Sequence, residues 1–485
     1  MGQDFDVIII GSGVVGSAVA REISRYKLKV CVLEKELDVC SETSGRNSGV
    51  LHAGFNNRPG TLMAKYCVQG NLEFDTVAKE LDIPFKRTGK VVVGFDNADR
   101  KKLEELKAQG EANGVPGLEL IGQDRLQQLA PHVRGRFALY SPTTAILNPF
   151  IYTVALAENA YQNGVAFKFD HQVQQILREG SVYRVITSQG EYLAQWVINC
   201  AGLHADTICR MVGIDDYTIY PCRGEYFILD QRVGEYLDIP AYPVPNIKEG
   251  GLGIHITPTI DGNVLIGPST EYIDARDDYA ATQEIMDLLI KDGSRIFPHI
   301  KREFFIRNFC GIRPKLVSKE QGGFADFVIE KRPEVPHFIN LVGIESPGLT
   351  SAVPIARRVV ELLGEEMALE KNQTFNPMRK GIVPFAEQPP EVQQQLIATD
   401  PDYGEIICRC ETVTKAEIMA AINNPLGVST VVGIKNRTRA MMGRCQGGYC
   451  QMRIAELLLA KHGLPVEKLT YARAGSNMFT GKVRN

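Results

Sequence analysis

The sequence predicts an α/β protein of two or three domains. Its 485 residues are more than one hydrophobic core usually holds, and 44% hydrophobic with 23% charged residues is typical of a soluble globular chain. The opening of the chain alternates between strand and helix patterns around a glycine-rich turn, and four of the eleven cysteines lie between positions 408 and 450. These observations predict a nucleotide-binding α/β unit at the start and a small separate module at the end.

The opening stretch DFDVIIIGSGVVGSAVAREISRYKLKVCVLEKE predicts a strand, a tight turn, a helix and a second strand. We expect the strands at 7–10 and 29–33 and the helix at 17–25. The turn has the G-x-G-x-x-G spacing that lets a backbone approach a pyrophosphate at a helix N-terminus, formed by Gly11, Gly13 and Gly16. Glu34 ends the second strand, where an acid accepts ribose hydroxyls, and Lys35 follows it. This context predicts a dinucleotide site.

Two later segments favour FAD over NAD as the dinucleotide. The loop CSETSGRNSGVLHAGFNNRPG, from Cys40, is polar and rich in Gly and Ser, so its N–H groups can wrap a second part of a cofactor. The segment WVINCAG, from Trp196, has the pattern of a strand that returns to the cofactor and ends in Ala-Gly. FAD is longer than NAD and is usually held by several such segments. The candidate FAD contacts from this part of the chain are Ser44, Arg46, Asn47, Ser48, Gly49, Val173, Ala201 and Gly202.

Three further motifs carry a family resemblance. SGRNSGVLHAGFNNRPGTLMAKYCVQGN, YPVPNIKEGGLGIHITPTIDGNVLIGP and ESPGLTSAVPIA resemble the D-amino-acid-oxidase-like superfamily of FAD oxidoreductases, and within it the L-2-hydroxyglutarate dehydrogenase/oxidase branch. The resemblance covers roughly residues 5–365. It implies a doubly wound FAD-binding domain interleaved with a mainly antiparallel sheet that covers the flavin and binds substrate. The segments that agree with such a sheet, separated by turns such as SQGE and IDGN, are 183–188, 223–229, 253–258 and 263–267.

Enzymes of this superfamily pass a hydride from a substrate carbon to the flavin, so a base and an anion-binding group are expected beside it. His52, in GVLHAG, is expected near the flavin as a base, an electrostatic partner or a covalent attachment point. His255, in a strand where it would face away from Ile254 and Ile256, is a candidate base. Arg313, in CGIRPKL, matches a G-[IV]-R arginine that faces flavin and substrate, and its planar fork suits a carboxylate or phosphate. The competing interpretations are that His52 is a hydrogen-bonded loop histidine, that His255 lies on the sheet surface, and that Arg313 is a surface arginine in a turn.

The resemblance also implies a last cofactor segment at GIESPGLTSA, where a Gly/Pro turn enters a helix. Backbone N–H groups and the helix N-terminus would face the pyrimidine side of the flavin, where reduced flavin is negative. The alternative is a plain strand-to-helix turn. The FAD candidates from this segment and from the strand of Arg313 are Gly311, Gly343, Pro347, Gly348, Leu349 and Thr350.

A change of composition separates the C-terminal part of the chain. Residues 371–401 are polar, carry several prolines and show little periodicity apart from a short helix at 392–397. We therefore expect an FAD-dependent oxidoreductase domain at 1–370, a linker at 371–401 and a small domain at 402–485. Within the small domain, KAEIMAAI follows a capping box and QMRIAELLLAKHG is a second helix.

The small domain contains two tight cysteine pairs, Cys408-x-Cys410 and Cys445-x4-Cys450. Clustered cysteines in a reducing compartment indicate metal ligation, with zinc and iron–sulfur as candidates and free thiols as the alternative. Zinc sites more often show C-x2-C pairs. C-x-C followed by C-x4-C, with two glycines between the last cysteines, resembles the bacterioferritin-associated-ferredoxin-like [2Fe-2S] domain. Such a cluster accepts one electron at a time, so it would give reduced FAD an exit other than O2, which favours a dehydrogenase.

The complete arrangement, with CRCETVT and RTRAMMGRCQGGYC, resembles the large subunit of anaerobic glycerol-3-phosphate dehydrogenase. This resemblance implies oxidation of glycerol 3-phosphate to dihydroxyacetone phosphate, and partner subunits, a flavoprotein and a small iron–sulfur protein, that take the electrons. The chain departs from that subunit where ESPGLT replaces a GGK segment. The alternatives are therefore L-2-hydroxyglutarate or another 2-hydroxy acid, an imino or amino acid, and an electron-transfer subunit without its own substrate.

Charge and hydropathy argue against other classes of protein. The net charge is -3 with both signs mixed, so no nucleic-acid partner is expected. No apolar run is long enough for a transmembrane segment, and the N-terminus lacks a secretory signal pattern. We expect a cytoplasmic enzyme, with any membrane contact made through partners.

Overall fold

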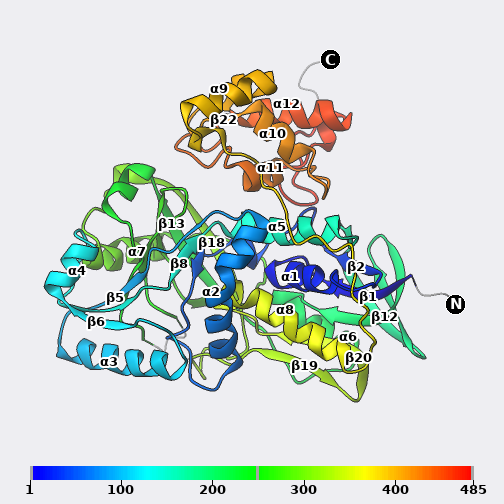
Figure 1. The fold of residues 1–485 in the computed structure, drawn as a ribbon, viewed down its shortest axis with the longest axis horizontal. Helices are drawn as coiled ribbons and strands as arrows, with labels where there is room; N and C mark the ends of the chain where they lie inside the picture. The colour runs from blue at the N-terminus through cyan, green and yellow to red at the C-terminus, as the bar shows by residue number, and fades with distance from the viewer. Residues whose placement is uncertain (1–3, 247–250, 482–485) are drawn as a thin grey trace.

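The computed structural model describes residues 4–246 and 251–481, so 247–250 of the YPVPNIKEGG motif lie outside the described residues. Two large sheets and a C-terminal module (residues 402–481) make up the described chain, and Figure 1 shows the module in orange to red above the first sheet. No helix among the described residues is long and apolar enough to cross a membrane. The helices are α1 (Val14–Ile23), α2 (Leu62–Leu81), α3 (Asn97–Ala112), α4 (Gln123–Leu129), α5 (Pro149–Gln162), α6 (Ala205–Met211), α7 (Gln283–Ile296), α8 (Gly348–Gly364), α9 (Pro390–Thr399), α10 (Lys415–Ile422), α11 (Val431–Thr438) and α12 (Gln451–His462).

The first sheet has a parallel centre, because β12, β1, β2 and β9 run side by side in one direction. β20 also pairs parallel with β12, whereas the β10–β11 hairpin and β19 pair antiparallel with their neighbours. Its strands are β1 (Phe5–Ile10), β2 (Val30–Leu33), β9 (Ala166–Lys168), β10 (Val173–Glu179), β11 (Val182–Thr187), β12 (Gly190–Asn199), β19 (Val328–Arg332) and β20 (Val335–Val342).

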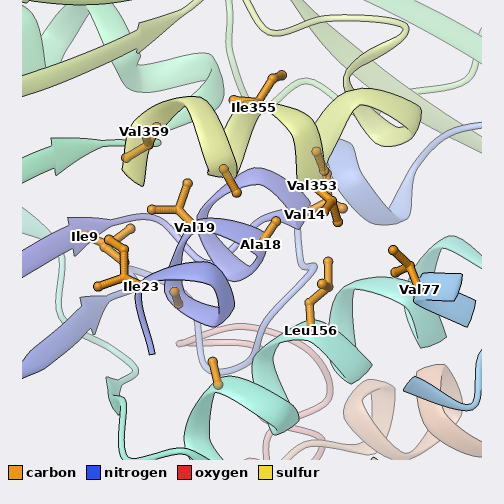
Figure 2. Close-up of a cluster of buried hydrophobic side chains, with 14 of the residues drawn as sticks. Ile9, Val14, Ala18, Val19, Ile23, Val77, Leu156, Val353, Ile355 and Val359 are labelled. Carbon is orange, nitrogen blue, oxygen red and sulfur yellow. The ribbon is translucent and has the colours of Figure 1, made fainter. Parts of the chain in front are cut away.

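Both faces of this sheet are covered, as the doubly wound expectation requires. Val7 and Ile9 of β1 pack into a core with α1, α5 and α8, whereas Ile8 and Ile10 enter a second core that includes residues of α6. Alternate residues of a strand point to opposite faces, so the unbroken apolar run of β1 reflects burial on both sides. Figure 2 shows the first of these cores, with α1 lying between α8 and α5.

The second sheet is largely antiparallel and carries the substrate side of the expected fold. Its order is β17-β13-β16-β15-β14-β5-β7-β6, with β18 also paired to β13, and α7 packs on it. Of the four strand-like segments expected for this sheet, 223–229, 253–258 and 263–267 are present in it as β13, β15 and β16. The expectation was wrong for 183–188, which forms β11 of the first sheet because it pairs with β10 in a hairpin and then with β12. The strands of this sheet are β5 (Lys90–Gly94), β6 (Glu119–Gly122), β7 (Phe137–Ser141), β13 (Tyr220–Leu229), β14 (Ala241–Pro243), β15 (His255–Pro258), β16 (Val264–Gly267), β17 (Glu271–Tyr272) and β18 (Phe305–Lys315).

Some expected boundaries are shifted. The first helix begins at Val14 rather than 17, because the turn glycines lead directly into it. The WVINCAG strand ends at Asn199, and Ala201 and Gly202 form the turn that follows. All four residues of β15 are buried, so the alternation around His255 separates two buried faces rather than core from solvent. A small sheet joins β3 (Val50–Leu51), β8 (Ala145–Leu147) and β4 (Phe85–Lys86).

The C-terminal module has its own core, formed by α10, α11, α12 and the hairpin of β21 (Ile406–Cys408) and β22 (Val413–Thr414). The expected capping box is present at α10: the Thr414 hydroxyl accepts from the N–H of Glu417, and the Glu417 carboxylate accepts from the N–H of Thr414. Gly463 ends α12 in the left-handed conformation. Residues ahead of the module lie along the first domain, where Arg379 forms a buried ion pair with Glu158 of α5.

Candidate functional site

A cavity of about 580 Å³ lies between the first sheet and the second. It is lined by most of the residues that the sequence singled out, although they come from distant parts of the chain. The predicted residues that line it are Gly11, Gly13, Glu34, Lys35, Ser44, Arg46, Asn47, Ser48, His52, Val173, Ala201, Gly202, His255, Gly311, Arg313, Pro347, Gly348 and Leu349.

Four predicted cofactor residues do not line the cavity: Gly16, Gly49, Gly343 and Thr350. A side chain at Gly16 would collide with the carbonyl of Gly11, so this glycine permits close packing of helix on strand. Gly49 and Gly343 have φ of 64° and 69° and lie against Leu147 and Leu316. The buried Thr350 hydroxyl accepts a hydrogen bond from the N–H of His52 at 3.0 Å. These residues shape the walls rather than face the cavity.

Glu34 organises the turn after β1. Its Oε2 accepts from the N–H and the hydroxyl of Ser12 at 2.7 and 2.9 Å, and its Oε1 accepts from the N–H of Glu36 at 3.0 Å. Burial raises the pKa of Glu34, although these hydrogen bonds favour its charged form. Since a carboxylate has about four acceptor positions, Glu34 can still accept a ribose hydroxyl at the cavity wall.

The loop from Thr43 to Gly49 is held tightly against the second sheet. The N–H of Val14, at the start of α1, donates to the Ser44 hydroxyl at 2.9 Å. A Cβ at Gly311 would overlap the carbonyl oxygen of Arg46, so glycine is required where β18 passes this loop. The Arg46 guanidinium lies 4.1 Å from the ring centre of Tyr279, and its buried Nε has no hydrogen-bond partner within the described ranges.

These observations fit a bound FAD. The cavity has the size of a cofactor site, two helix N-termini (α1 and α8) open on it, and Arg46 offers an unpaired buried donor at its wall. Gly13, Glu34 and Lys35 would hold the nucleotide end, and Pro347 to Leu349 would hold the other.

His255 is part of a stack that the sequence did not predict. Its ring lies face to face with Tyr242 of β14, with 3.8 Å between ring centres, and its Nδ1 is 2.9 Å from the Thr257 hydroxyl. Lys90 lies nearby, fully buried, with its Nζ 4.3 Å from the ring centre of Tyr242 and 4.4 Å from that of Phe55. The Lys90 ammonium has no hydrogen-bond acceptor in the part of the chain that the structure describes, and burial lowers its pKa to about 7. The sequence signal for Lys90 is that a lysine begins the apolar strand segment KVVVG.

His52 and His255 are both held neutral. Burial, followed by the charge of Lys90, lowers the pKa of His52 to about 3. Burial above all lowers the pKa of His255 well below its usual range, and the charges of Lys90, His52 and Arg313 act in the same direction. Both rings are therefore unprotonated at neutral pH and can accept a proton, but burial makes each a weaker base than an exposed histidine.

Arg313 lies on β18 at the wall that it shares with β13. Its Nη2 donates to the carbonyl of Ser269 at 2.9 Å, and its Nε contacts the carbonyl of Cys222 at 3.5 Å. Among the described residues, Arg313 makes its hydrogen bonds through Nε and Nη2, which leaves Nη1 for another acceptor. The cavity therefore combines a fixed cation with two neutral bases.

The four cysteines of the module come together as a chain of sulfur contacts. The sulfur of Cys410 lies 3.9 Å from that of Cys408 and 3.7 Å from that of Cys445, and Cys450 contacts Cys408. Backbone N–H groups of Tyr449 and Gly447 point at Cys445 and lower the pKa of its thiol. In the described ranges no three such ligands surround a single metal ion. A binuclear cluster instead needs two pairs of thiolates, which C-x-C and C-x4-C supply.

The module is attached to the first domain by buried charges. Arg437 of α11 forms a paired contact with Asp38, with 2.6 Å between Nη1 and Oδ2 and 2.9 Å between Nη2 and Oδ1. Arg439 bridges Glu411 of the module and Asp261 in the turn between β15 and β16. α11 also packs on α5, as Figure 1 shows.

Comparison with known proteins agrees with both parts of this description. Residues 6–362 match the family model "FAD dependent oxidoreductase", and residues 406–460 match "BFD-like [2Fe-2S] binding domain". The chain is 39% identical over 484 residues to a glycerol 3-phosphate dehydrogenase of Caloramator mitchellensis, which covers 99% of each chain. It is 29% identical to the mitochondrial L-2-hydroxyglutarate dehydrogenase of Caenorhabditis elegans, over 73% of this chain and 92% of that protein.

A solved structure supports the same assignment. The dithionite-reduced L-α-glycerophosphate oxidase of Mycoplasma pneumoniae, with FAD bound, superimposes with a TM-score of 0.72 at 30% identity, over 77% of this chain and 98% of that one. The predicted α/β fold and both predicted cofactors, FAD and [2Fe-2S], are thereby confirmed. The chain belongs to the FAD-dependent oxidoreductase family and carries a BFD-like [2Fe-2S] domain at its C-terminal end.

Proposed function

We propose that this enzyme is a dehydrogenase that oxidises the secondary alcohol of glycerol 3-phosphate to dihydroxyacetone phosphate. The observation that carries the proposal is the shared cavity of Arg313, His52 and His255, which offers one cation for an anionic group and neutral bases for a hydroxyl proton. The similarity over both domains to a glycerol 3-phosphate dehydrogenase supports this choice of substrate.

The reaction divides between the cofactor and the side chains. Bound FAD would accept the hydride that leaves the carbinol carbon. His52 or His255 takes the hydroxyl proton, so that the carbon–oxygen double bond can form. Arg313 holds the phosphate, and this contact orients the carbinol hydrogen toward the flavin end of the cavity.

The C-terminal module gives the electrons a route out of the site. We infer that Cys408, Cys410, Cys445 and Cys450 hold the cluster through which they leave, one at a time, to partner subunits. We expect the enzyme to act in the cytoplasm, where a reducing environment keeps clustered cysteines available as ligands.

The substrate is tested by anaerobic mixing of the holoenzyme with glycerol 3-phosphate while the visible flavin band is followed. We expect rapid bleaching in the wild type. In the Arg313→Ala variant kcat/KM should fall by about 10²-fold or more, a loss of a few kcal/mol for a charge-assisted contact. Arg134→Ala removes an exposed arginine far from the cavity lining and should leave the rate unchanged. Equal rates in all three proteins would remove Arg313 from the site.

L-2-hydroxyglutarate is the second candidate, because a guanidinium binds a carboxylate as well as a phosphate and because several relatives oxidise this acid by name. The same assay separates the two. Bleaching by L-2-hydroxyglutarate without bleaching by glycerol 3-phosphate would transfer the function to the 2-hydroxy acid.

A further inference from the structure

The four cysteines differ sharply in exposure. Cys408 and Cys450 are fully buried in the core of the module, whereas Cys410 and Cys445 are exposed. A cluster held by all four would therefore reach the protein surface on one side only. That side is where a second protein could approach closely enough to take an electron.

The exposed side chains close in sequence to the cysteines are of a particular kind. Tyr449 and Met452 are 42% and 49% exposed, which is high for large apolar residues. Arg409 stacks on Tyr449, with its guanidinium carbon 4.3 Å from the ring centre. Arg444, on the other side of Cys445, has a side chain that is 63% exposed. Tyrosine, methionine and arginine are the residues that protein–protein interfaces favour.

The charge of this surface is positive. The two charged side chains among the residues just named, Arg409 and Arg444, are both arginines, although the whole chain has a net charge of -3. Asp230 pairs with Arg444 through Nε, and Glu405 pairs with the neighbouring Arg453. Arg409 has no carboxylate partner among the residues that the structure describes. A positive patch of this kind attracts a negatively charged partner from a distance and orients it.

We propose that the surface formed by Arg409, Cys410, Arg444, Cys445, Tyr449 and Met452 is the docking site of an acidic one-electron carrier protein. The proposal rests on the electron route proposed above and adds the chemistry of the recipient. The carrier takes one electron per encounter from the cluster and leaves oxidised protein behind, so two encounters balance one oxidised substrate molecule.

Two haem proteins of opposite charge test this proposal with the holoenzyme. Cytochrome b5 is acidic and cytochrome c is basic, and the reduction of either is followed by its absorbance. We expect binding of oxidised cytochrome b5 by calorimetric titration, a dissociation constant that rises with salt, and substrate-driven reduction that is at least about tenfold more efficient than that of cytochrome c. Preference for cytochrome c would overturn the proposal.

Charge reversal locates the surface. The double variant Arg409→Glu/Arg444→Glu should weaken cytochrome b5 binding by at least about tenfold. The double variant Lys461→Glu/Lys468→Glu makes the same change of charge at exposed positions at and beyond the far end of α12 and should have little effect. Equal effects of the two changes would show that only the overall charge matters and would refute the docking site. Cluster bleaching by substrate, recorded without any carrier, tests the electron route separately, because binding of the oxidised carrier does not depend on it.

Discussion

Replacing Asp38 with alanine would leave the Arg437 guanidinium buried without its carboxylate. The two side chains are 10% and 2% exposed, and two short contacts join them. Removal of one partner from a buried ion pair costs about 3–5 kcal/mol, because the remaining charge is left without compensation. Since this pair connects α11 to the loop after β2, we expect that cost to weaken the attachment of the module by roughly 10²- to 10⁴-fold.

Rapid mixing measures the consequence. Flavin bleaching by substrate should keep its rate in Asp38→Ala, whereas the following change in iron–sulfur absorbance should slow, and limited proteolysis should cut more readily ahead of the module. The double variant Asp38→Leu/Arg437→Leu removes both charges and should recover much of the loss. Glu179→Ala breaks an exposed pair with Arg184 and serves as the matched control, because exposed ion pairs add little to stability. Normal cluster reduction in Asp38→Ala would refute the view that this pair holds the module in place.

Three further substitutions test the site. Lys90→Met removes a buried cation, so the pKa of His255 should rise and the acid limb of kcat/KM against pH should move to higher pH; an unmoved limb would mean that the Lys90 charge does not reach the base. Gly311→Ala should push β18 from the cofactor loop, at a cost of about 1–3 kcal/mol, and raise the dissociation constant of FAD about tenfold to hundredfold in a flavin-fluorescence titration. Cys445→Ser should abolish the iron–sulfur absorbance while FAD remains bound and reducible, and loss of both cofactors would contradict separate domains.

Local signals in the sequence were sufficient for the elements that hold the cofactors. The glycine spacing after β1 and the capping box of Thr414 and Glu417 each involve only a few neighbouring residues, so both can be predicted directly from the sequence. The cysteine pairs are equally local, and only their approach across the module depends on the fold. His52, His255 and Arg313 were found because their motifs resemble a known family, and the structure brings all three to one cavity.

The remaining parts depend on contacts between distant segments. Asp38 and Arg437 are 399 positions apart, and nothing near either residue indicates the other. The requirement for Gly311 comes from the backbone of Arg46, which only the folded chain places beside it. Lys90 was missed because a charged residue at the start of an apolar strand is normally expected at the surface.

The short loop after β2 contacts both cofactor domains. Glu34 begins this loop and faces the FAD cavity, and Asp38, four residues later, binds the C-terminal module. If bound nucleotide orders this loop, the same ordering fixes Asp38, which binds the module. Because such coupling is reciprocal, a factor by which FAD tightens the attachment of the module is the same factor by which the attached module tightens FAD. The loop thus supplies a direct stretch of chain through which flavin binding and attachment of the module can affect each other.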